Sequence, residues 1–325
     1  MSTVIDSAMR EQLLERRHRL EAATAEADDA AQFRRLLEEV DAALARMDEA
    51  TYGLCEVCHD PVEADRLLAD PLVCVCLGCL SPRQRRALEE DLELAAQIQA
   101  GLLPCREFRH DGWQVSYHYE AASLVSGDYC DFVTAEDGSL YFMLGDVAGK
   151  GVAASLLMSQ LHAMFRVLVP LGLPVNQLVE RASRLFCEST LPTHYATLVV
   201  GRADTAGEVE ICNAGHLPPI LMRGGHARLI EATGLPVGIF CNEQFTSEKF
   251  RAEAGDTLFL FTDGLSESRD PAAAEYGSER LRSLLCRNHS LAPADLIGAC
   301  LRDLEEFCAG AARHDDLTVL ALRRV

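Results

Sequence analysis

The sequence predicts an α+β fold in which two packed, mainly antiparallel sheets carry helices outside them, preceded by a helical N-terminal region. From about residue 113 onward the sequence contains strand-like runs, such as 140–145 and 257–262. Several of these runs follow each other with no helix between them, which favours antiparallel pairing. Helical periodicity occupies residues 5–50 instead. Between these regions, residues 51–80 hold five cysteines. The length of 325 residues suggests two domains, one of them large.

The charge balance excludes some classes of partner. The chain carries 50 Asp and Glu against 30 Lys and Arg, a net charge of −20, whereas nucleic acid or an anionic membrane requires a concentrated basic surface. No run approaches the roughly 18 apolar residues of a spanning helix, and the first residues lack the apolar core of a signal peptide. We therefore expect a cytoplasmic protein with reduced thiols and no direct contact with nucleic acid or membrane.

Residues 5–50 are expected to form two antiparallel helices. This segment is rich in Ala, Leu, Glu and Arg and contains no Gly or Pro. Leu36, Val40 and Leu44 recur at helical spacing, which predicts one apolar stripe. The stripe fades at 25–31, where we place the bend between the helices.

A linker helix is predicted over 81–104. Ser81-Pro82 is a helix start signal, and Gly101 and Pro104 mark the end. Its apolar side carries Leu88, Leu92, Ala95 and Leu102. Two roles for this side stay open: pairing with a second copy to form a homodimer, or packing on the chain's own catalytic domain.

The rest of the chain alternates strand-like and helical segments. Strands are expected at 113–119, 140–145, 195–201, 207–212, 218–222, 257–262 and 317–322. Helices are expected at 152–169, 174–189, 277–287 and 293–309. This order suits two sheets packed face to face with helices on the outside.

Four cysteines have the spacing of a zinc site. Cys55 and Cys58 are followed, after 17 residues, by Cys76 and Cys79. Two residues between thiolates let both sulfurs face one tetrahedral ion, about 2.3 Å away. Cys74 lies too close to Cys76 to share that geometry. Because four cysteines close the coordination sphere, we predict one structural Zn²⁺; incidental buried cysteines and a redox pair are the alternatives.

The residues around these cysteines, TYGLCEVCHDPVEADRLLADPLVCVCLGC, resemble the zinc finger of the DksA/TraR family. The preceding helical pair is similar to that family's coiled-coil hairpin, which enters the secondary channel of RNA polymerase with acidic residues at its tip. Here the tip reads EADDAAQ, with Asp28 and Asp29, and does not match the family's tip motif. The resemblance implies either a contact with RNA polymerase or reuse as a sensory or scaffold module.

Aspartates lie where predicted strands begin or end. Asp146 ends LYFMLGD, Asp263 ends TLFLFTD, Asp315 and Asp316 open DDLTVLAL, and Asp128 and Asp131 lie in SGDYCD. A strand that stops on Asp delivers a carboxylate on rigid backbone, and a neighbouring glycine (Gly127, Gly145 or Gly264) lets a metal or substrate approach the main chain. Clustered carboxylates without His or Cys favour Mg²⁺ or Mn²⁺. Taken alone, an Asp-Gly pair is most often a turn, and an Asp-Asp pair before a strand is usually a solvated loop.

Six ordered motifs resemble those of the metal-dependent (PPM) protein phosphatases, and most closely the SpoIIE/RsbU-type bacterial serine phosphatases. They are SGDYCD (126–131), LGDVAGKGVAASLLM (144–158), NAGHLPPIL (213–221), GLPVGI (234–239), FTDGLSES (261–268) and HDDLTV (314–319). Residues 89–104 are similar to the segment that precedes the catalytic domain in that branch. Ser126 and Cys130 depart from the family, which usually has Gly and an aromatic residue there.

The resemblance implies an αββα sandwich with two Mn²⁺ or Mg²⁺ ions at one end. Asp146 would bridge both ions, the backbone oxygen of Val147 would be a ligand, Asp128, Asp263 and Asp315 would complete the site, and Asp316 is a further candidate ligand. Two such ions lower the pKa of a shared water, which then attacks the phosphorus of a phosphoserine or phosphothreonine in line.

Several residues keep two interpretations. Asp131 is a less direct candidate for the metal site, and Lys150 suits either a phosphate contact or a solvated loop. Asn213 and His216 suit either catalysis or a tight turn in which His216 hydrogen-bonds a loop. The scattered cysteines are expected to be reduced and packed in the core: Cys105, Cys187, Cys212, Cys241, Cys286, Cys300 and Cys308.

We therefore expect three parts: a hairpin with a zinc finger (1–80), a linker helix (81–104) and a phosphatase domain (105–325). The resemblance implies a serine/threonine phosphatase that acts on a regulatory phosphoprotein, a STAS-type antagonist of an anti-sigma factor, and is regulated by its zinc-finger module. The alternative is a non-enzymatic transcription regulator that binds RNA polymerase through that module.

Overall fold

The computed structural model describes residues 3–26, 31–191, 193–311, 313 and 315–325, and it divides into two units, Met1–Asp91 and Leu92–Val325. Each unit has its own apolar core. Asp28 and Asp29, at the expected hairpin tip, lie outside the described residues.

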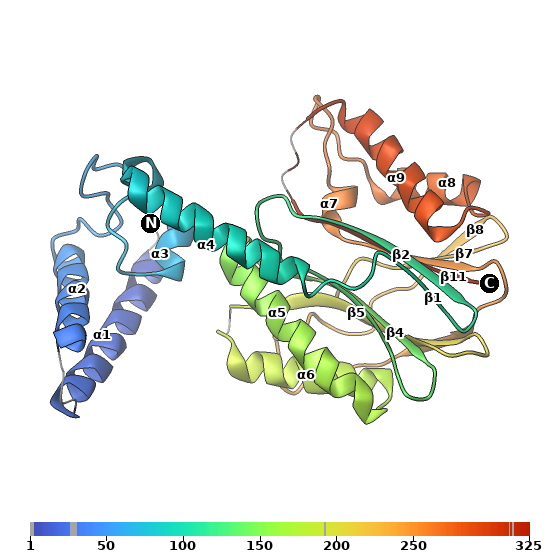
Figure 1. The fold of residues 1–325 in the computed structure, drawn as a ribbon, viewed down its shortest axis with the longest axis horizontal. Coiled ribbons are helices and arrows are strands. Elements are labelled where there is room, and N and C mark those ends of the chain that lie inside the picture. The colour runs from blue at the N-terminus through green and yellow to red at the C-terminus, as the bar shows by residue number, and fades with distance from the viewer. Residues whose placement is uncertain (1–2, 27–30, 192, 312, 314) are drawn as a thin grey trace. The chain divides into compact units, whose positions relative to one another are not determined.

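The first unit is built on a pair of antiparallel helices (Figure 1). Its elements are α1 (Thr3–Glu26), α2 (Ala31–Asp48), the short α3 (Ala64–Ala69) and the 3-10 turn η1 (Leu77–Cys79). Leu13 of α1 packs with Val40 and Ala43 of α2, and Arg10 pairs with Asp48 at 2.8 Å. Because the beginning of α1 meets the end of α2, the helices are antiparallel, and the two predicted N-terminal helices are confirmed.

Helix α4 (Pro82–Ala100) begins with a capping box. The Ser81 hydroxyl oxygen accepts a hydrogen bond from the Gln84 amide at 3.3 Å, and Gln84 Oε1 accepts one from the Ser81 amide at 3.1 Å. These reciprocal bonds satisfy two amide groups that would otherwise lack a partner at the helix start. The four residues of the predicted apolar side, Leu88, Leu92, Ala95 and Leu102, are half-buried.

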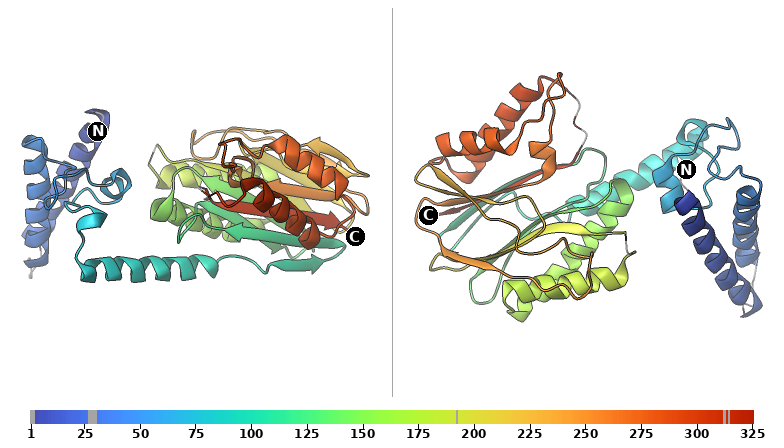
Figure 2. Two further views of the ribbon diagram at one scale, coloured as in Figure 1. Left: turned by 90° about the horizontal axis from the view of Figure 1, so that it is seen from above. Right: turned by 180° about the vertical axis from the view of Figure 1, so that it is seen from behind.

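The second unit contains two antiparallel sheets, as Figures 1 and 2 show. One has the strand order β1-β2-β11-β10-β7-β8, and the other has the order β3-β4-β5-β6-β9. The strands are β1 (Glu107–His110), β2 (Trp113–Glu120), β3 (Asp128–Thr134), β4 (Leu140–Val147), β5 (Ala196–Ala203), β6 (Glu208–Ala214), β7 (Ile220–Arg223), β8 (His226–Leu229), β9 (Glu248–Arg251), β10 (Thr257–Phe261) and β11 (Leu317–Arg324). Neighbouring strands in both orders pair antiparallel.

Helices cover the outer face of each sheet, which makes an αββα sandwich (Figure 2). Helices α5 (Gly151–Leu168) and α6 (Val175–Ser189) pack on the β3–β9 sheet, with η2 (Val169–Leu171) between them. Helices α8 (Ser278–Arg287) and α9 (Pro293–Cys308) pack on the other sheet, and the single turn α7 (Asp263–Ser266) follows β10. The predicted fold class is confirmed.

Strand β4 shows why its residues are apolar on both faces. Leu140, Phe142 and Leu144 contribute to the core between the two sheets, whereas Tyr141 and Met143 contribute to the core under α5 and α6. Side chains alternate between the faces of a strand. A residue's position in this alternation therefore decides whether it points between the sheets or toward the helices.

Residues Gly151–Leu171, which comprise α5 and η2, are long and apolar enough to cross a membrane by length and composition. No such segment is expected from the sequence. In the structure Ala154, Met158, Leu161 and Phe165 of α5 are buried in the core of the sandwich. This segment therefore has the one-sided burial of a helix that packs on a sheet.

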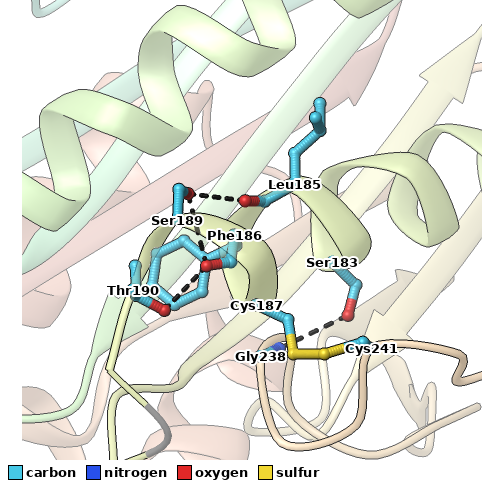
Figure 3. Close-up of a disulfide and its surroundings, with 8 residues drawn as sticks. All are labelled: Ser183, Leu185, Phe186, Cys187, Ser189, Thr190, Gly238 and Cys241. Atoms are coloured by element: carbon cyan, nitrogen blue, oxygen red, sulfur yellow. Dashed lines mark hydrogen bonds between the residues drawn. A yellow bond between two sulfur atoms is a disulfide. The ribbon is translucent and has the colours of Figure 1, made fainter.

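A disulfide joins Cys187 of α6 to Cys241 in the loop between β8 and β9 (Figure 3). The expectation that these two cysteines are reduced packing residues is wrong. Their Cα atoms lie 5.4 Å apart, because the loop is held against α6, where the Gly238 amide donates to the Ser183 hydroxyl at 3.3 Å. Cys212, Cys300 and Cys308 are buried, as expected, and Cys286 is half-buried, whereas Cys105 is exposed, so its expected place in the core is wrong.

The disulfide closes a sequence separation of 54 residues, so its loss should increase the entropy of the unfolded chain. The double substitution Cys187→Ser/Cys241→Ser should lower the free energy of unfolding of the second unit by up to about 4 kcal/mol. Urea unfolding of both proteins without reductant measures the difference. Dithiothreitol should lower the midpoint of the wild type only, and equal lowering in both proteins would contradict this prediction.

Candidate active site and cysteine cluster

The four predicted zinc ligands come together in the first unit. The Sγ atoms of Cys55, Cys58, Cys76 and Cys79 all lie within 4.8 Å of one another. The sulfurs of Cys58 and Cys76 are 3.6 Å apart. Cys74 stays outside this cluster, as its sequence position predicts.

The thiols of the cluster perturb one another in a way that suits a cation. Amide hydrogen bonding from Cys58 lowers the pKa of Cys55 to about 6, whereas hydrogen bonding with the Cys58 and Cys76 thiols raises the pKa of Cys79 to about 12. Four neighbouring thiolates repel each other unless a cation lies between them. The donor set of four sulfurs therefore fits a tetrahedral structural Zn²⁺.

Backbone contacts hold the two cysteine pairs around a very small core. Arg66 Nη1 donates to the Val75 carbonyl at 2.8 Å, and Glu63 Oε1 accepts from the Leu77 amide at 3.0 Å. The buried apolar residues in this core, apart from the cysteines, are Val62 and Leu67. So little apolar surface cannot stabilise a segment of this length alone, and metal binding would supply the missing free energy.

In the second unit, Asp128 and Asp146 meet on neighbouring strands. They are directly opposite each other in the register of β3 and β4. Both have the same position in the strand alternation as residues of the core between the sheets, such as Cys130 and Leu144. The two carboxylates are therefore delivered to the end of the sandwich between the sheets.

Two threonines of the opposite sheet hold Asp128. Thr262, just after β10, donates to Asp128 Oδ2 at 3.0 Å, and Thr318 of β11 donates to the same oxygen. Thr318 also donates its amide to Thr262 Oγ1 at 2.9 Å. Asp128 is only 1% exposed, so these bonds fix its orientation and join the two sheets at the site.

Asp263, Asp315 and Asp316 reach the same region from the other sheet. Asp263 is the first residue of α7, and the other two precede β11. Asp316 accepts hydrogen bonds from the amides of Ala122 at 2.7 Å and Gly127 at 2.9 Å. Its carboxylate therefore ties the segment before β11 to the segment before β3.

Lys150 does not lie free in a solvated loop. Its Nζ donates to Asp315 Oδ2 at 2.9 Å, and this bond raises the pKa of the lysine. Lys150 thus brings a positive charge to these carboxylates through its pair with Asp315.

The carboxylates raise each other's pKa. Burial, together with the charges of Asp263, Asp315 and Asp316, raises the pKa of Asp146 to about 7. Burial, followed by the charge of Asp146, raises the pKa of Asp128 well above its usual range, and burial with the charge of Asp315 raises that of Asp263. Such mutual repulsion is relieved by bound cations.

The donors fit hard divalent cations. They are carboxylate oxygens, with the Val147 carbonyl nearby: it lies 3.1 Å from the point where a Cβ on Gly127 would stand. Mg²⁺ and Mn²⁺ prefer such oxygen ligands. In the described part of the chain, only the cysteine cluster brings three or more ligand atoms within 4.8 Å of one another, so the aspartates surround a wider space.

The glycines beside the aspartates serve the backbone's own packing. A Cβ at Gly264 would stand 1.9 Å from the Asp316 carbonyl oxygen, and one at Gly145 would stand 2.6 Å from the Thr197 carbonyl oxygen. The expectation was that these glycines admit a metal or substrate. At both positions the space is instead occupied by neighbouring main chain, which brings the strands that carry the aspartates close together.

Asp131 lies on the opposite face of β3 from Asp128, because side chains alternate between the two faces of a strand. It points toward α5, where it accepts from Arg166 Nε and Nη2 at 2.8 and 2.7 Å and lies 3.4 Å from His162 Nδ1. Its carboxylate is fully buried. The structure thus gives Asp131 an ion pair that fastens α5 to β3, not a place beside Asp128.

His216 takes part in a buried turn. Its amide donates to Asn213 Oδ1 at 2.8 Å, its Nδ1 lies 2.8 Å from Thr197 Oγ1, and its Nε2 lies 3.1 Å from the Phe261 carbonyl. Burial lowers the pKa of His216 to about 4, so the ring is neutral near pH 7. The geometry corresponds to the tight-turn interpretation, in which His216 links β5 to the end of β10.

Comparison with known proteins agrees with this geometry. The signature described as Stage II sporulation protein E (SpoIIE) matches residues 136–325, which is more than half of the chain. The chain belongs to the SpoIIE family. Residues 50–85, which contain the cysteine cluster, match the signature described as prokaryotic DksA/TraR C4-type zinc finger. Both resemblances inferred from the motifs are therefore confirmed.

Two curated relatives show the extent of the similarity. Protein IcfG of Synechocystis sp. is 28% identical over 263 residues, which is 72% of this chain and 41% of IcfG. Phosphoserine phosphatase RsbP of Bacillus subtilis is 29% identical over 236 residues, which is 70% of this chain and 56% of RsbP. This SpoIIE-family chain thus spans about half the length of these relatives.

Solved structures share the sandwich. The RsbU and RsbW domains of a Mycobacterium tuberculosis protein match with a TM-score of 0.57 and 29% identity, over 68% of this chain and 61% of that one. The SiaA-PP2C domain of Pseudomonas aeruginosa matches with a TM-score of 0.64 and 18% identity, over 74% and 98%. The second similarity supports the fold alone.

Removing one cysteine of the cluster should remove zinc. Full-length protein carrying Cys58→Ser should retain well under one Zn²⁺ per chain, because a structural site needs all four ligands. Cys74→Ser is the matched control, since Cys74 lies outside the cluster, and should retain one Zn²⁺. Zinc released by acid and measured with a chromogenic chelator tests this, and equal zinc in both variants would refute the assigned ligand set.

The crowded carboxylates should make the metal-free protein less stable as pH rises. Asp146 ionises near pH 7 when folded but near about pH 4 when unfolded, so the folded state binds more protons between these values. Its free energy of unfolding should therefore fall as pH increases from about 4 to about 7. The fall should be shallower in Asp146→Asn. Urea unfolding in EDTA measures both slopes, and parallel slopes would contradict the assignment.

Proposed function

We propose that this protein is a metal-dependent phosphatase that hydrolyses phosphoserine or phosphothreonine on a regulatory protein. The observation that carries the proposal is the delivery of carboxylates from β3, β4, α7 and the segment before β11 to one end of the sandwich. Membership of the SpoIIE family and similarity to the phosphoserine phosphatase RsbP support it.

Six residues would hold two Mn²⁺ or Mg²⁺ ions in this proposal. They are Asp128, Asp146, Asp263, Asp315, Asp316 and, through its carbonyl, Val147. Bound divalent ions lower the pKa of water and neutralise the charge of phosphoryl oxygens. The protein contributes the preorganised geometry: the two threonines orient Asp128, and Asp316 fixes the backbone at Gly127.

A cleft beside the cluster could receive the phosphorylated segment. It has a volume of about 270 Å³ and reaches Asp315. Arg269 and Arg313 line it. Each pairs with a glutamate, but a guanidinium has five N–H donors, which also suit phosphate or peptide carbonyls. This volume accommodates a phosphorylated side chain with its neighbouring backbone, which suits a protein substrate.

The proposed substrate is a phosphorylated STAS-type antagonist of an anti-sigma factor. The support is similarity to RsbP and RsbU of Bacillus subtilis, both described as phosphoserine phosphatases, and to a solved chain that combines RsbU and RsbW domains. Within this proposal, residues 1–80 form a regulatory zinc-binding module, residues 81–104 the linker and residues 105–325 the catalytic domain. The Zn²⁺ site stabilises the module and takes no part in the chemistry.

A second function rests on the zinc finger. Because residues 50–85 match the DksA/TraR signature, we also consider a transcription regulator that binds RNA polymerase through the first unit without catalysis. The two proposals differ in what they require of the aspartates. Polymerase binding that persists in Asp146→Asn, together with no hydrolysis by the wild type, would favour this second function.

The phosphatase proposal predicts a metal-dependent activity that needs Asp146 and Asp263. Wild-type protein with Mn²⁺ should release phosphate from a phosphorylated STAS-type protein. Asp146→Asn and Asp263→Asn should each reduce kcat/KM by at least about 100-fold. Changing a residue that supports a metal ligand usually reduces activity by about 10- to 100-fold, and loss of the ligand itself should cost more. EDTA should abolish the activity.

The matched control is Asp111→Asn, since Asp111 is exposed at a turn and has a φ of 40°, which Asn tolerates. This variant should keep wild-type activity. Phosphate release that is unaffected by EDTA, or equal in the wild type and Asp146→Asn, would refute the proposed function.

A further inference from the structure

Gln99 of α4 lies in an unusual position for a polar residue. Of the 19 residues of α4, all of which the structure describes, Gln99 is the buried one, with 5% exposure. Its Nε2 donates to the Ser126 carbonyl at 2.7 Å, and its Oε1 accepts from the Ser126 amide at 3.0 Å. One side chain thus satisfies both main-chain groups of a residue that is itself fully buried.

The residue that Gln99 holds begins the segment that enters the carboxylate cluster. Ser126 Oγ accepts from the Asp128 amide at 3.0 Å. Gly127, between them, donates its amide to Asp316 Oδ2 at 2.9 Å, and its carbonyl accepts from the Val147 amide at 3.3 Å. Residues 126–128 therefore connect three of the proposed ligand positions through short hydrogen bonds.

The backbone of Ser126 depends on this side chain because it lies outside the strand ladder. Strand β3 begins at Asp128, and its register with β4 starts there. Buried amide and carbonyl groups without a partner are strongly disfavoured. Without the Gln99 amide, residues 126–128 would have to move until water or another group satisfied Ser126.

The end of α4 is itself firmly placed. Leu103, four residues after Gln99, packs against the core between the sheets, and the Tyr117 hydroxyl donates to the Pro104 carbonyl at 2.8 Å. A side chain can hold a loop in one conformation only if its own backbone is held in place. A mobile helix would let the loop move with it, and the preorganisation of the site would be lost.

We infer that Gln99 is a positioning residue, which fixes residues 126–128 and thereby sets the affinity of the carboxylate cluster for divalent cations. The expected effect of Gln99 on hydrolysis rests on the proposed function. Its expected effects on backbone mobility and on cation binding do not depend on that function. Gln99 contacts neither cation nor substrate. It acts through the main chain of Ser126 and Gly127.

The test compares full-length wild type, Gln99→Ala, Gln99→Glu and the control Gln97→Ala, which changes an exposed glutamine of the same helix. Hydrogen–deuterium exchange of the metal-free proteins reports the 122–128 segment. Gln99→Ala should accelerate exchange there at least about 10-fold, while Gln97→Ala should not. Gln99→Glu keeps the shape but turns the donor to the Ser126 carbonyl into an acceptor, so it should also accelerate exchange.

Calorimetric titration with Mn²⁺ gives the second readout. Both Gln99 variants should bind Mn²⁺ about 10- to 100-fold more weakly than the wild type, as is usual for supporting residues of metal sites, and Gln97→Ala should match the wild type. A lower thermal midpoint with unchanged Mn²⁺ affinity would assign Gln99 to stability alone and overturn the inference. If Gln99→Ala does not fold, the shape-conserving Gln99→Glu decides the question by the same criteria.

The outcomes also separate this inference from the proposed function. A wild type that binds Mn²⁺ but releases no phosphate, with weakened binding in the Gln99 variants, refutes the phosphatase and supports the role of Gln99. A wild type that hydrolyses phosphoserine, with Gln99→Ala equal to it in Mn²⁺ affinity and exchange, refutes the role of Gln99 alone. A wild type that binds no Mn²⁺ refutes both.

Discussion

The second unit depends on one constraint: several carboxylates, from the buried Asp128 to the half-buried Asp315, are held at one end of the sandwich. Asp128 is the extreme case, because it is almost completely buried and accepts hydrogen bonds from two threonines of the opposite sheet. Like charges in such a place repel strongly. The fold tolerates the repulsion because β3, β4, β10 and β11 bury large apolar side chains over much of their length.

The capacity of this site to bind cations follows from the repulsion among its carboxylates. Carboxylates that raise each other's pKa form a site that a divalent cation stabilises, and the surrounding hydrogen bonds keep the donors from relaxing apart. Asp316 accepts a hydrogen bond from the Gly127 amide, just before β3, and Asp315 pairs with Lys150, just after β4. Both candidate ligands before β11 are therefore bonded to segments of the other sheet. The cysteine cluster of the first unit follows the same principle with softer donors, and its four sulfurs would close the coordination sphere of one ion.

Much of this could be predicted from the sequence. The CxxC pairs and the aspartates at strand ends are local patterns that can be recognised in the sequence alone. The family motifs that contain the aspartates indicate the fold. Asp131 could not be placed, because its direction depends on the strand alternation and its partner Arg166 lies 35 residues away. The Cys187–Cys241 pairing had no spacing signal. The role of Gln99 was not predictable, because the apolar positions of α4 indicate a stripe, whereas the buried residue of this helix is polar.

The most direct test of the account is anomalous X-ray scattering from crystals of the full chain grown with Mn²⁺. The account predicts manganese peaks at the end of the sandwich, within about 2.0–2.6 Å of carboxylate oxygens from both sheets, with Asp146 shared between two ions and Asp131 contacting none. Well-ordered Asp146, Asp263 and Asp315 with no manganese between them at millimolar Mn²⁺ would contradict it.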